Sequence, residues 1–140
     1  MKRFCHPCII SAALVTICVL TLGATISAEQ IVSLDTEFAT VSRDIIDREP
    51  IDPGTIFPVS VGKLYFLTKI VNAQRPTEVT HVWYYGEKER ARVTLPVNSS
   101  SWRTYSSKLI QPHEVGDWYV DVLDPEGDLL VSVPFKVTQN

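Results

Sequence analysis

The chain alternates short runs rich in β-branched and aromatic residues with clusters of Pro, Gly, Asn and Asp. Almost no window has apolar residues three and four positions apart, so the pattern favours strands over helices. We predict strands over residues 31–41, 63–71, 79–85, 90–97, 102–110, 117–123 and 129–137. About seven short strands at this spacing are typical of an all-β, antiparallel two-sheet β-sandwich. For a domain of about a hundred residues we expect immunoglobulin-like topology, with a barrel as the alternative.

Two segments near the start of this pattern are less regular. Residues 31–41 combine β-branched residues with apolar residues at helix-like spacing, and we expect an edge strand there. Residues 43–58 contain three prolines and four acidic residues: Pro50, Pro53, Pro58, Asp44, Asp47, Glu49 and Asp52. Because proline has no N–H to donate to a sheet, we expect a long surface connection over this range.

The predicted strands after residue 62 have a clearer pattern of apolar and polar positions. Residues 63–71 are apolar on both faces, which predicts a central strand. Residues 90–97 alternate apolar and polar positions and should form a hairpin with residues 79–85. Without a disulfide between the sheets, we expect large aromatic side chains to hold the core together, namely Phe66, Trp83, Trp118 and Phe135.

The N-terminal segment differs in composition from the rest of the chain. Lys2 and Arg3 precede an uncharged stretch over residues 9–26, and Ala28 comes just before the first acidic residue. This order is typical of a secretory signal peptide, so we predict a leader helix over residues 1–28 and an exported protein, periplasmic or secreted. About eighteen uncharged residues also reach the lower limit for a membrane-spanning helix, so an uncleaved N-terminal membrane anchor is the alternative.

Residues 29–140 would then form one β-sandwich domain, long enough to bury a core of its own. All three cysteines lie in the first eighteen residues, so this domain can form no disulfide. Without Lys2 and Arg3, eleven Lys and Arg stand against sixteen Asp and Glu, a net charge of −5 with neutral histidines. Phosphate binding requires a clustered basic face, so we expect no nucleic-acid partner.

Several strings of residues together resemble a known family. They are His81–Tyr85 (HVWYY), Trp102–Lys108 (WRTYSSK), Gly116–Val120 (GDWYV) and Phe135–Val137 (FKV). Their identity and order resemble the uncharacterised bacterial family DUF2914, a domain of unknown function, over most of the chain after Val59. The resemblance implies a small β-sandwich, often attached to exported or membrane-associated proteins. It implies no established activity, so no catalytic residue is carried over.

The run Trp102 to Lys108 is the best candidate for a binding surface, because neither side of this predicted strand is plainly apolar. Arg103 and Tyr105 share one side, and Trp102 and Lys108 the other. A strand of this kind lies at a sheet edge or has its hydroxyls bonded in an internal network. In a structural role, Arg103 would stack on an aromatic ring and the serines would bond to backbone. In a binding role, Arg103 and Lys108 would meet an anionic group while Trp102 or Tyr105 stacks on a sugar or an aromatic side chain.

His81 shares its side of a strand with Trp83, so we expect it at the core margin, bonded to a carbonyl, with a ligand role as the alternative. No spacing of histidines and cysteines indicates zinc. The acidic residues Asp124, Glu126 and Asp128 resemble the start of a calcium loop, but the later loop positions do not fit, and a turn explains them. We therefore expect no metal and no cofactor.

The sequence contains no nucleophile motif with its companion residues, so we predict that the protein is not an enzyme. Two functions remain. The first is a protein-interaction domain of the bacterial cell envelope, which presents an aromatic and basic strand or an open sheet edge to a protein partner. The second is a carbohydrate or cell-wall polysaccharide binding module that uses Trp102, Arg103, Tyr105 and Tyr84. A membrane would be contacted only through an uncleaved leader.

Overall fold

The computed structural model describes residues 32–140. Within this range the chain forms nine strands and one short 3₁₀ helix. They are β1 (Asp35–Ile46), β2 (Glu49–Gly54), β3 (Ile56–Pro58), η1 (Val59–Val61), β4 (Lys63–Val71), β5 (Thr77–Tyr85), β6 (Lys88–Val97), β7 (Ser101–Leu109), β8 (Gly116–Leu123) and β9 (Leu129–Thr138). The predicted leader, residues 1–28, lies outside the described residues.

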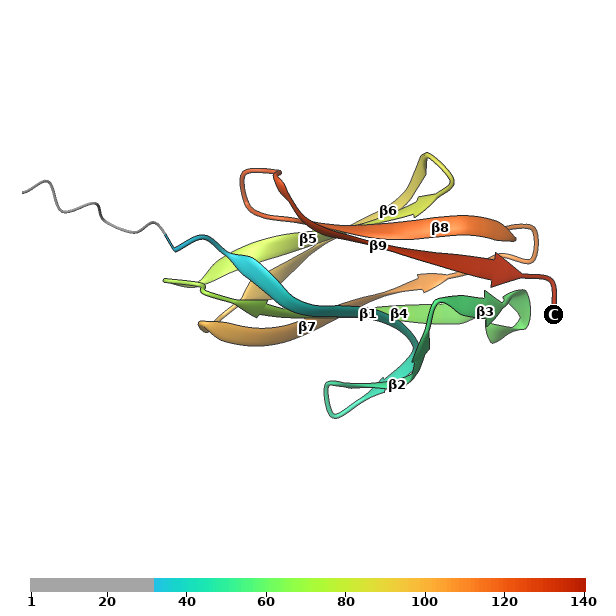
Figure 1. Ribbon diagram of the computed structural model, residues 1–140, viewed down its shortest axis with the longest axis horizontal. Helices are drawn as coiled ribbons and strands as arrows, with labels where there is room; N and C mark the ends of the chain where they lie inside the picture. Colours follow the sequence, from blue (N-terminus) through green and yellow to red (C-terminus); the bar gives the residue numbers. More distant parts are fainter. Residues whose placement is uncertain (1–31) are drawn as a thin grey trace, which may run out of the picture. The chain divides into compact units, whose positions relative to one another are not determined.

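The strands form two layers (Figure 1). A four-stranded sheet has the order β2-β1-β4-β7, and a five-stranded sheet has the order β3-β9-β8-β5-β6. Every neighbouring pair is antiparallel except β3 and β9, which are parallel. The prediction of an all-β, two-sheet sandwich is therefore confirmed. No helix among residues 32–140 has the length and apolar character needed to cross a membrane.

The N-terminal part of the sandwich limits one prediction and corrects another. β1 lies between β2 and β4 in the sheet order, but β2 pairs only with residues 41–46, so the predicted edge position holds for residues 35–40, which pair with β4 alone. The segment predicted as a surface connection contains β2 and β3, which raises the strand count from about seven to nine. Pro50 and Pro53 lie in β2, which pairs with β1 on one side only. A strand at the end of a sheet bonds to a neighbour on one side only and tolerates prolines that an interior strand would not, so prolines do not rule out a strand.

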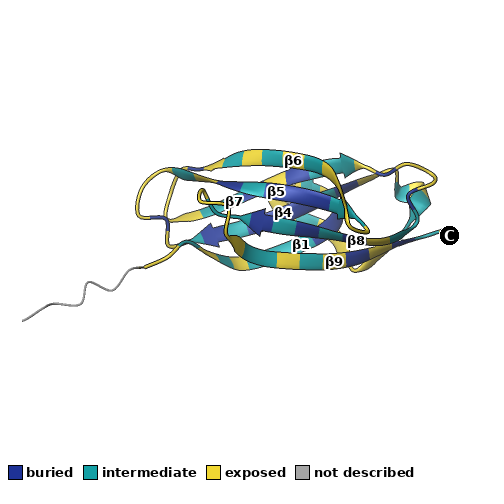
Figure 2. Ribbon diagram, turned by 90° about the horizontal axis from the view of Figure 1, so that it is seen from above, coloured by how far each residue is buried: buried dark blue, intermediate teal, exposed yellow. Residues whose placement is uncertain are grey.

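The space between the sheets is filled by aromatic and branched side chains. Trp83, Trp118 and Phe66 are at most 1 % exposed, and Phe135 is 4 % exposed. The ring of Trp83 lies edge-on to Phe66 and Phe135 with centroids 6.2 and 6.1 Å apart, and Trp118 stacks on Phe135 at 5.8 Å. Figure 2 shows buried positions along β4 and β5 and exposed positions along β6. The predicted aromatic core, the central strand β4 and the β5–β6 hairpin are confirmed.

Candidate functional site

Strand β7, which carries most of the candidate residues, forms one edge of the four-stranded sheet beside β4. Its side chains alternate between the two sides of the sheet. Thr104 and Ser106 point between the sheets and are buried, whereas Tyr105 and Leu109 point outward and are 46 % and 60 % exposed. Both explanations of the mixed pattern therefore hold, because β7 lies at an edge and also takes part in an internal network.

The inner side of β7 belongs to a chain of buried hydrogen bonds. The indole N–H of Trp83 donates to Ser106 Oγ at 3.0 Å, and Ser106 Oγ lies 2.8 Å from His81 Nδ1. His81 Nε2 lies 3.1 Å from Thr68 Oγ1, and the Thr68 hydroxyl donates to the carbonyl of Thr104 at 3.3 Å. We call these residues the inner network.

The end groups of the inner network determine the direction of every bond in it. The Thr68 hydroxyl hydrogen is used by the Thr104 carbonyl, so His81 Nε2 must carry the ring proton and donate to Thr68. His81 Nδ1 then accepts from the Ser106 hydroxyl, whose oxygen accepts from Trp83. All donors and acceptors are satisfied only when the imidazole is neutral.

His81 is fully buried, so the predicted position at the core margin, bonded to a carbonyl, is wrong. Burial lowers the pKa of His81 from 6.5 to about 3, because the imidazolium form would lose its hydration between the sheets. The Phe66 ring packs edge-on against the imidazole at 4.9 Å. Ser106 and His81 are within the distance expected of a nucleophile and its base, yet both are enclosed by core side chains, and this arrangement gives them a structural role.

The outer side of β7 meets two residues of β4 that sequence reasoning did not single out. The rings of Tyr65 and Tyr105 lie 6.3 Å apart, and the Lys63 ammonium lies 5.1 Å from the centroid of the Tyr65 ring. Lys63 is paired in register with Leu109. We call Lys63, Tyr65, Tyr105 and Leu109 the outer patch. The outward position of Tyr65 in an alternating strand was the available signal, but the sequence did not show that β7 lies beside β4.

Arg103 and Trp102 are held by the β1–β2 hairpin. Arg103 Nη1 donates to the Arg48 carbonyl at 3.1 Å and lies 3.1 Å from a Glu49 carboxylate oxygen. The Arg103 guanidinium also lies over the ring of Phe38 at 5.6 Å, which confirms the prediction that it stacks on an aromatic ring. Trp102 packs against the core, with the Arg48 guanidinium 5.1 Å from its ring centroid. The chain itself thus occupies the guanidinium of Arg103, one of the two cations that were predicted to meet an anionic group.

Backbone hydrogen bonds at the two ends of the β4–β7 ladder reveal which β7 residues face outward from the sheet edge. Ile110 N–H donates to Gly62 O at 2.9 Å, and Asn72 N–H donates to Ser100 O at 3.0 Å. The register between β4 and β7 is continuous. Bonded pairs in an antiparallel ladder recur at every second residue, so the even-numbered residues of β7 bond to β4. The odd-numbered residues Ser101, Arg103, Tyr105, Ser107 and Leu109 direct their N–H and C=O groups away from it.

Side chains cap both ends of this free row of backbone groups. The Ser101 carbonyl accepts a bond from Ser99 Oγ at 2.8 Å, and the Leu109 carbonyl accepts one from Lys108 Nζ at 2.6 Å. Within residues 32–140, β7 has no strand on its second side. Among the described residues, both backbone groups of Arg103, Tyr105 and Ser107 are therefore open, and we call these three residues the open edge.

Tyr84, which was grouped with the β7 residues as a sugar-binding set, lies on the other sheet. Its ring stacks on that of Tyr119 at 4.6 Å, with 12° between the ring planes. Trp102 faces the core while Tyr105 faces outward on the four-stranded sheet. The four residues of the predicted sugar site thus do not meet on one surface.

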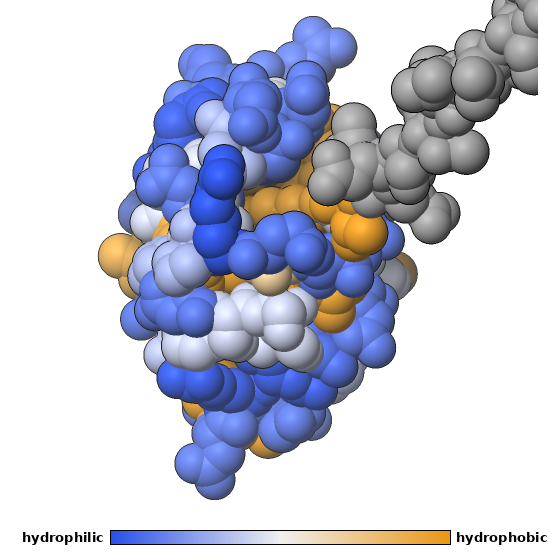
Figure 3. All heavy atoms as spheres, turned by 90° about the vertical axis from the view of Figure 1, so that its left-hand side faces the viewer, coloured by the Kyte–Doolittle hydropathy of each residue, from blue (hydrophilic) through white to orange (hydrophobic). Residues whose placement is uncertain are grey.

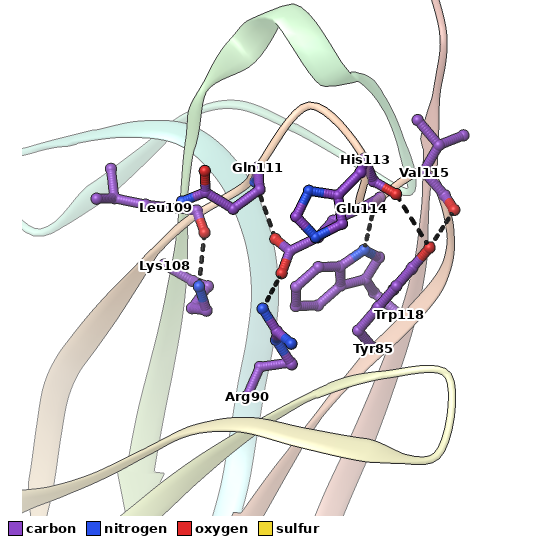
Figure 4. A network of polar contacts seen from close by, with 9 residues as sticks. All are labelled: Tyr85, Arg90, Lys108, Leu109, Gln111, His113, Glu114, Val115 and Trp118. Atoms are coloured by element: carbon purple, nitrogen blue, oxygen red, sulfur yellow. Dashed lines mark hydrogen bonds and ion pairs between the residues drawn. The ribbon is translucent and has the colours of Figure 1, made fainter.

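A second polar network fixes the loop between β7 and β8 (Figure 4). The Glu114 side chain is fully buried, and its carboxylate accepts from the Arg90 guanidinium and, at 2.9 Å, from Gln111 N–H. Trp118 Nε1 donates to the Glu114 carbonyl at 2.9 Å, and the Tyr85 hydroxyl donates to the Val115 carbonyl at 2.7 Å. No local pattern marks Glu114 as buried, because the Arg90 guanidinium that pairs with its carboxylate comes from the distant strand β6.

The end of the sandwich shown in Figure 3 has apolar surface among hydrophilic residues. A hollow of about 450 Å³ lies between the segment just before β1, the β4–β5 loop and the β8–β9 turn. Asp124 contributes to its lining, but Asp124 Oδ1 accepts from the N–H groups of Glu126 and Asp128 at 3.0 and 2.8 Å. This carboxylate therefore caps the turn. No cluster of three His, Cys, Asp or Glu side chains among residues 32–140 is arranged to hold a metal.

Fold and site together define a small β-sandwich domain whose edge strand β7 contains the open edge. The family model described as protein of unknown function (DUF2914) matches residues 76–137, from the residue before β5 almost to the end of β9. Over this range the chain is similar to the DUF2914 family, which confirms the resemblance inferred from the sequence strings. The part of the resemblance between Val59 and residue 76 lies outside the match. No match was found among curated proteins.

Proposed function

We propose that this chain is an exported, non-catalytic protein-interaction module that binds its partner by adding a strand to β7. The observation that carries the proposal is the open edge, whose unpaired backbone groups lie beside exposed Tyr105 and Leu109. A strand added at such an edge gains backbone hydrogen bonds, while side chains beside the edge select its sequence. The outer patch would supply apolar and aromatic contact next to those bonds.

The other sheet edges are less suited to strand addition. β2 contains two prolines, and β3 is only three residues long. β6 begins with Lys88, Glu89 and Arg90, continues with Arg92 and contains Pro96. Charged residues, prolines and short length are the means by which proteins block edge pairing. β7 has nine residues, no proline and three open residues in its middle.

Further parts of the proposal concern location and topology. The leader predicted over residues 1–28 supports a periplasmic or secreted location in a bacterial cell envelope. Immunoglobulin-like topology is supported by β8 lying between β5 and β9, by the pairing of β4 with β7 in the other sheet, and by the buried Trp83 on β5. A carbohydrate-binding module is the weaker candidate, because its predicted residues do not share a surface.

The proposal can be tested by photo-crosslinking in the cells that make the full chain. A photo-reactive phenylalanine replaces Tyr105, and in a control chain it replaces exposed Thr94 of β6. We expect a discrete cross-linked product from position 105 alone. Ser107→Pro should abolish the product, because it removes an N–H that points away from β4, whereas Ser107→Ala should retain it. Equal products from both positions, or a product that survives Ser107→Pro, would contradict strand addition at β7.

A further inference from the structure

We infer that the strand added to β7 is β7 of a second copy of this chain, paired antiparallel with Tyr105 on the two-fold axis. This inference rests on the proposed function and names its partner. Closed two-fold dimers use the same patch on both copies, so the patch must be complementary to itself. The open edge meets this condition in its backbone, its side chains and its charges.

The backbone condition follows from the position of the open residues. Arg103 and Ser107 lie symmetrically about Tyr105, and each of the three has both its N–H and its C=O free. With Tyr105 opposite Tyr105 of the second copy, Arg103 pairs with Ser107 in both directions, and every open group finds a partner.

Neighbouring registers satisfy fewer of these groups. A shift of two residues one way places Ser107 opposite Ser101, whose carbonyl already accepts from Ser99. The opposite shift places Arg103 opposite Leu109, whose carbonyl already accepts from Lys108. A shift of one residue would turn the side chains of the second copy to the wrong face of the extended sheet. The register centred on Tyr105 is therefore the best one for self-pairing.

The side chains and charges are compatible with this register. No two like charges lie directly opposite each other, because Arg103 faces Ser107, and the two Tyr105 rings form a cross-strand aromatic pair. The Arg103 charge is met within its own chain by Glu49 at 3.1 Å. On the inner side, Lys108 of one copy lies opposite Trp102 of the other, which brings an ammonium group beside an indole ring.

Engineered disulfides test the register in the full chain, in a background with Cys5, Cys8 and Cys18 each changed to Ser. Residues 32–140 contain no cysteine, so each new thiol is the only one present. A hydrogen-bonded antiparallel pair has its Cα atoms about 5.5 Å apart, within the range for a disulfide. We expect Tyr105→Cys to form a disulfide-linked dimer under mild oxidation and Thr94→Cys not to form one. A mixture of Arg103→Cys and Ser107→Cys chains should cross-link, whereas either alone should not.

Sedimentation equilibrium of the chain without added cysteines tests the association itself. We expect the average mass to rise with concentration from one chain mass towards two. Tyr105→Lys places like charges on the axis and Ser107→Pro removes an open N–H, so both should stay at one chain mass, while Ser107→Ala should still dimerise. Circular dichroism spectra and melting curves verify that each variant is folded, and Tyr105→Lys changes only an exposed side chain.

A single chain mass at every concentration, or equal disulfide yields from Tyr105→Cys and Thr94→Cys, would overturn the inference. A photo-crosslinked product from position 105 with a mass other than twice that of the chain would also overturn it, while strand addition at β7 to a different protein would stand. If position 105 gave no photo-crosslinked product that Ser107→Pro abolishes, both proposals would be overturned.

Discussion

The two sides of β7 differ in how completely their polar groups are satisfied. On the inner side, every polar atom of the path from Trp83 through Ser106 and His81 to Thr68 has a partner within the same chain. Tyr105 and Ser107 are the neighbours of Ser106 in the same strand. Their backbone groups point out of the sheet edge and have no hydrogen-bond partner among the described residues. Buried polar groups that are fully paired stabilise one fold, whereas open groups at an edge are available to a partner.

This difference separates two uses of residues that look alike in the sequence. Ser106 and Ser107 are adjacent serines in one strand, yet Ser106 is 6 % exposed and bonded to two side chains. Ser107 belongs to the open edge. We therefore expect substitutions on the inner side to change stability and substitutions on the outer side to change association. The following predictions test that division, from the largest effect to the smallest.

Trp83→Ala should have the largest effect, because it removes a fully buried indole and the donor that begins the inner network. Truncation of a core aromatic residue costs about 3 to 5 kcal/mol of unfolding free energy. Urea denaturation followed by circular dichroism measures the change, with Tyr105→Ala as the exposed aromatic control. A loss below about 1 kcal/mol would show that the inner side does not dominate stability.

Acid should weaken the inner side through His81. Its pKa is about 3 in the folded protein and 6.5 when unfolded, so between these values the unfolded state binds more protons and stability falls as the pH falls. At about pH 4.5 this contribution amounts to about 2 to 3 kcal/mol of lost unfolding free energy, and above the unfolded pKa it vanishes.

The measurement is a series of urea denaturation curves between neutral and acidic pH. His81→Gln should lose this part of the pH dependence, because it removes the imidazole. Every carboxylate is present in both chains, so the comparison isolates the contribution of His81. If the unfolding free energy fell equally steeply with pH in the original chain and in His81→Gln, His81 would not be held neutral by its surroundings.

Ser106→Ala and Ser107→Ala form a matched pair. Ser106→Ala leaves the indole N–H of Trp83 and Nδ1 of His81 without a partner, which should cost about 1 to 3 kcal/mol. Ser107→Ala touches no such bond and should stay within about 0.5 kcal/mol of the original chain. Thermal and urea unfolding of both variants give the comparison, and equal losses would remove the distinction between the two serines.

Arg103→Ala should cost less stability than any substitution in the inner network. Its ion pair with Glu49 joins side chains that are 31 % and 63 % exposed, and surface pairs of this kind contribute about 0.2 to 1 kcal/mol. The loss should shrink in high salt because screening weakens the pair. A loss above about 2 kcal/mol would indicate that the β1–β2 hairpin depends on Arg103 for its place on the sheet.

Local patterns in the sequence predicted much of the sandwich correctly. The alternation in β6, the two-sided apolar pattern of β4 and the inward-facing Trp118 all appear in the structure as expected. The errors lie in residues 43–58, where prolines and acidic residues predicted a surface connection although β2 and β3 form there. β1 extends beyond its predicted end to pair with β2, and prolines in β2 are tolerated because that strand ends the sheet.

By itself, the sequence determined the all-β class, the aromatic core and the similarity to the DUF2914 family over residues 76–137, because these depend on residue type and spacing along the chain. Only the tertiary structure decided that β7 is an edge strand, that Ser106 closes a buried network with His81, and that Arg103 is engaged by a hairpin about fifty residues away. Pairing between distant strands is set by the packing of the whole molecule, and no local pattern records which strand remains without a neighbour.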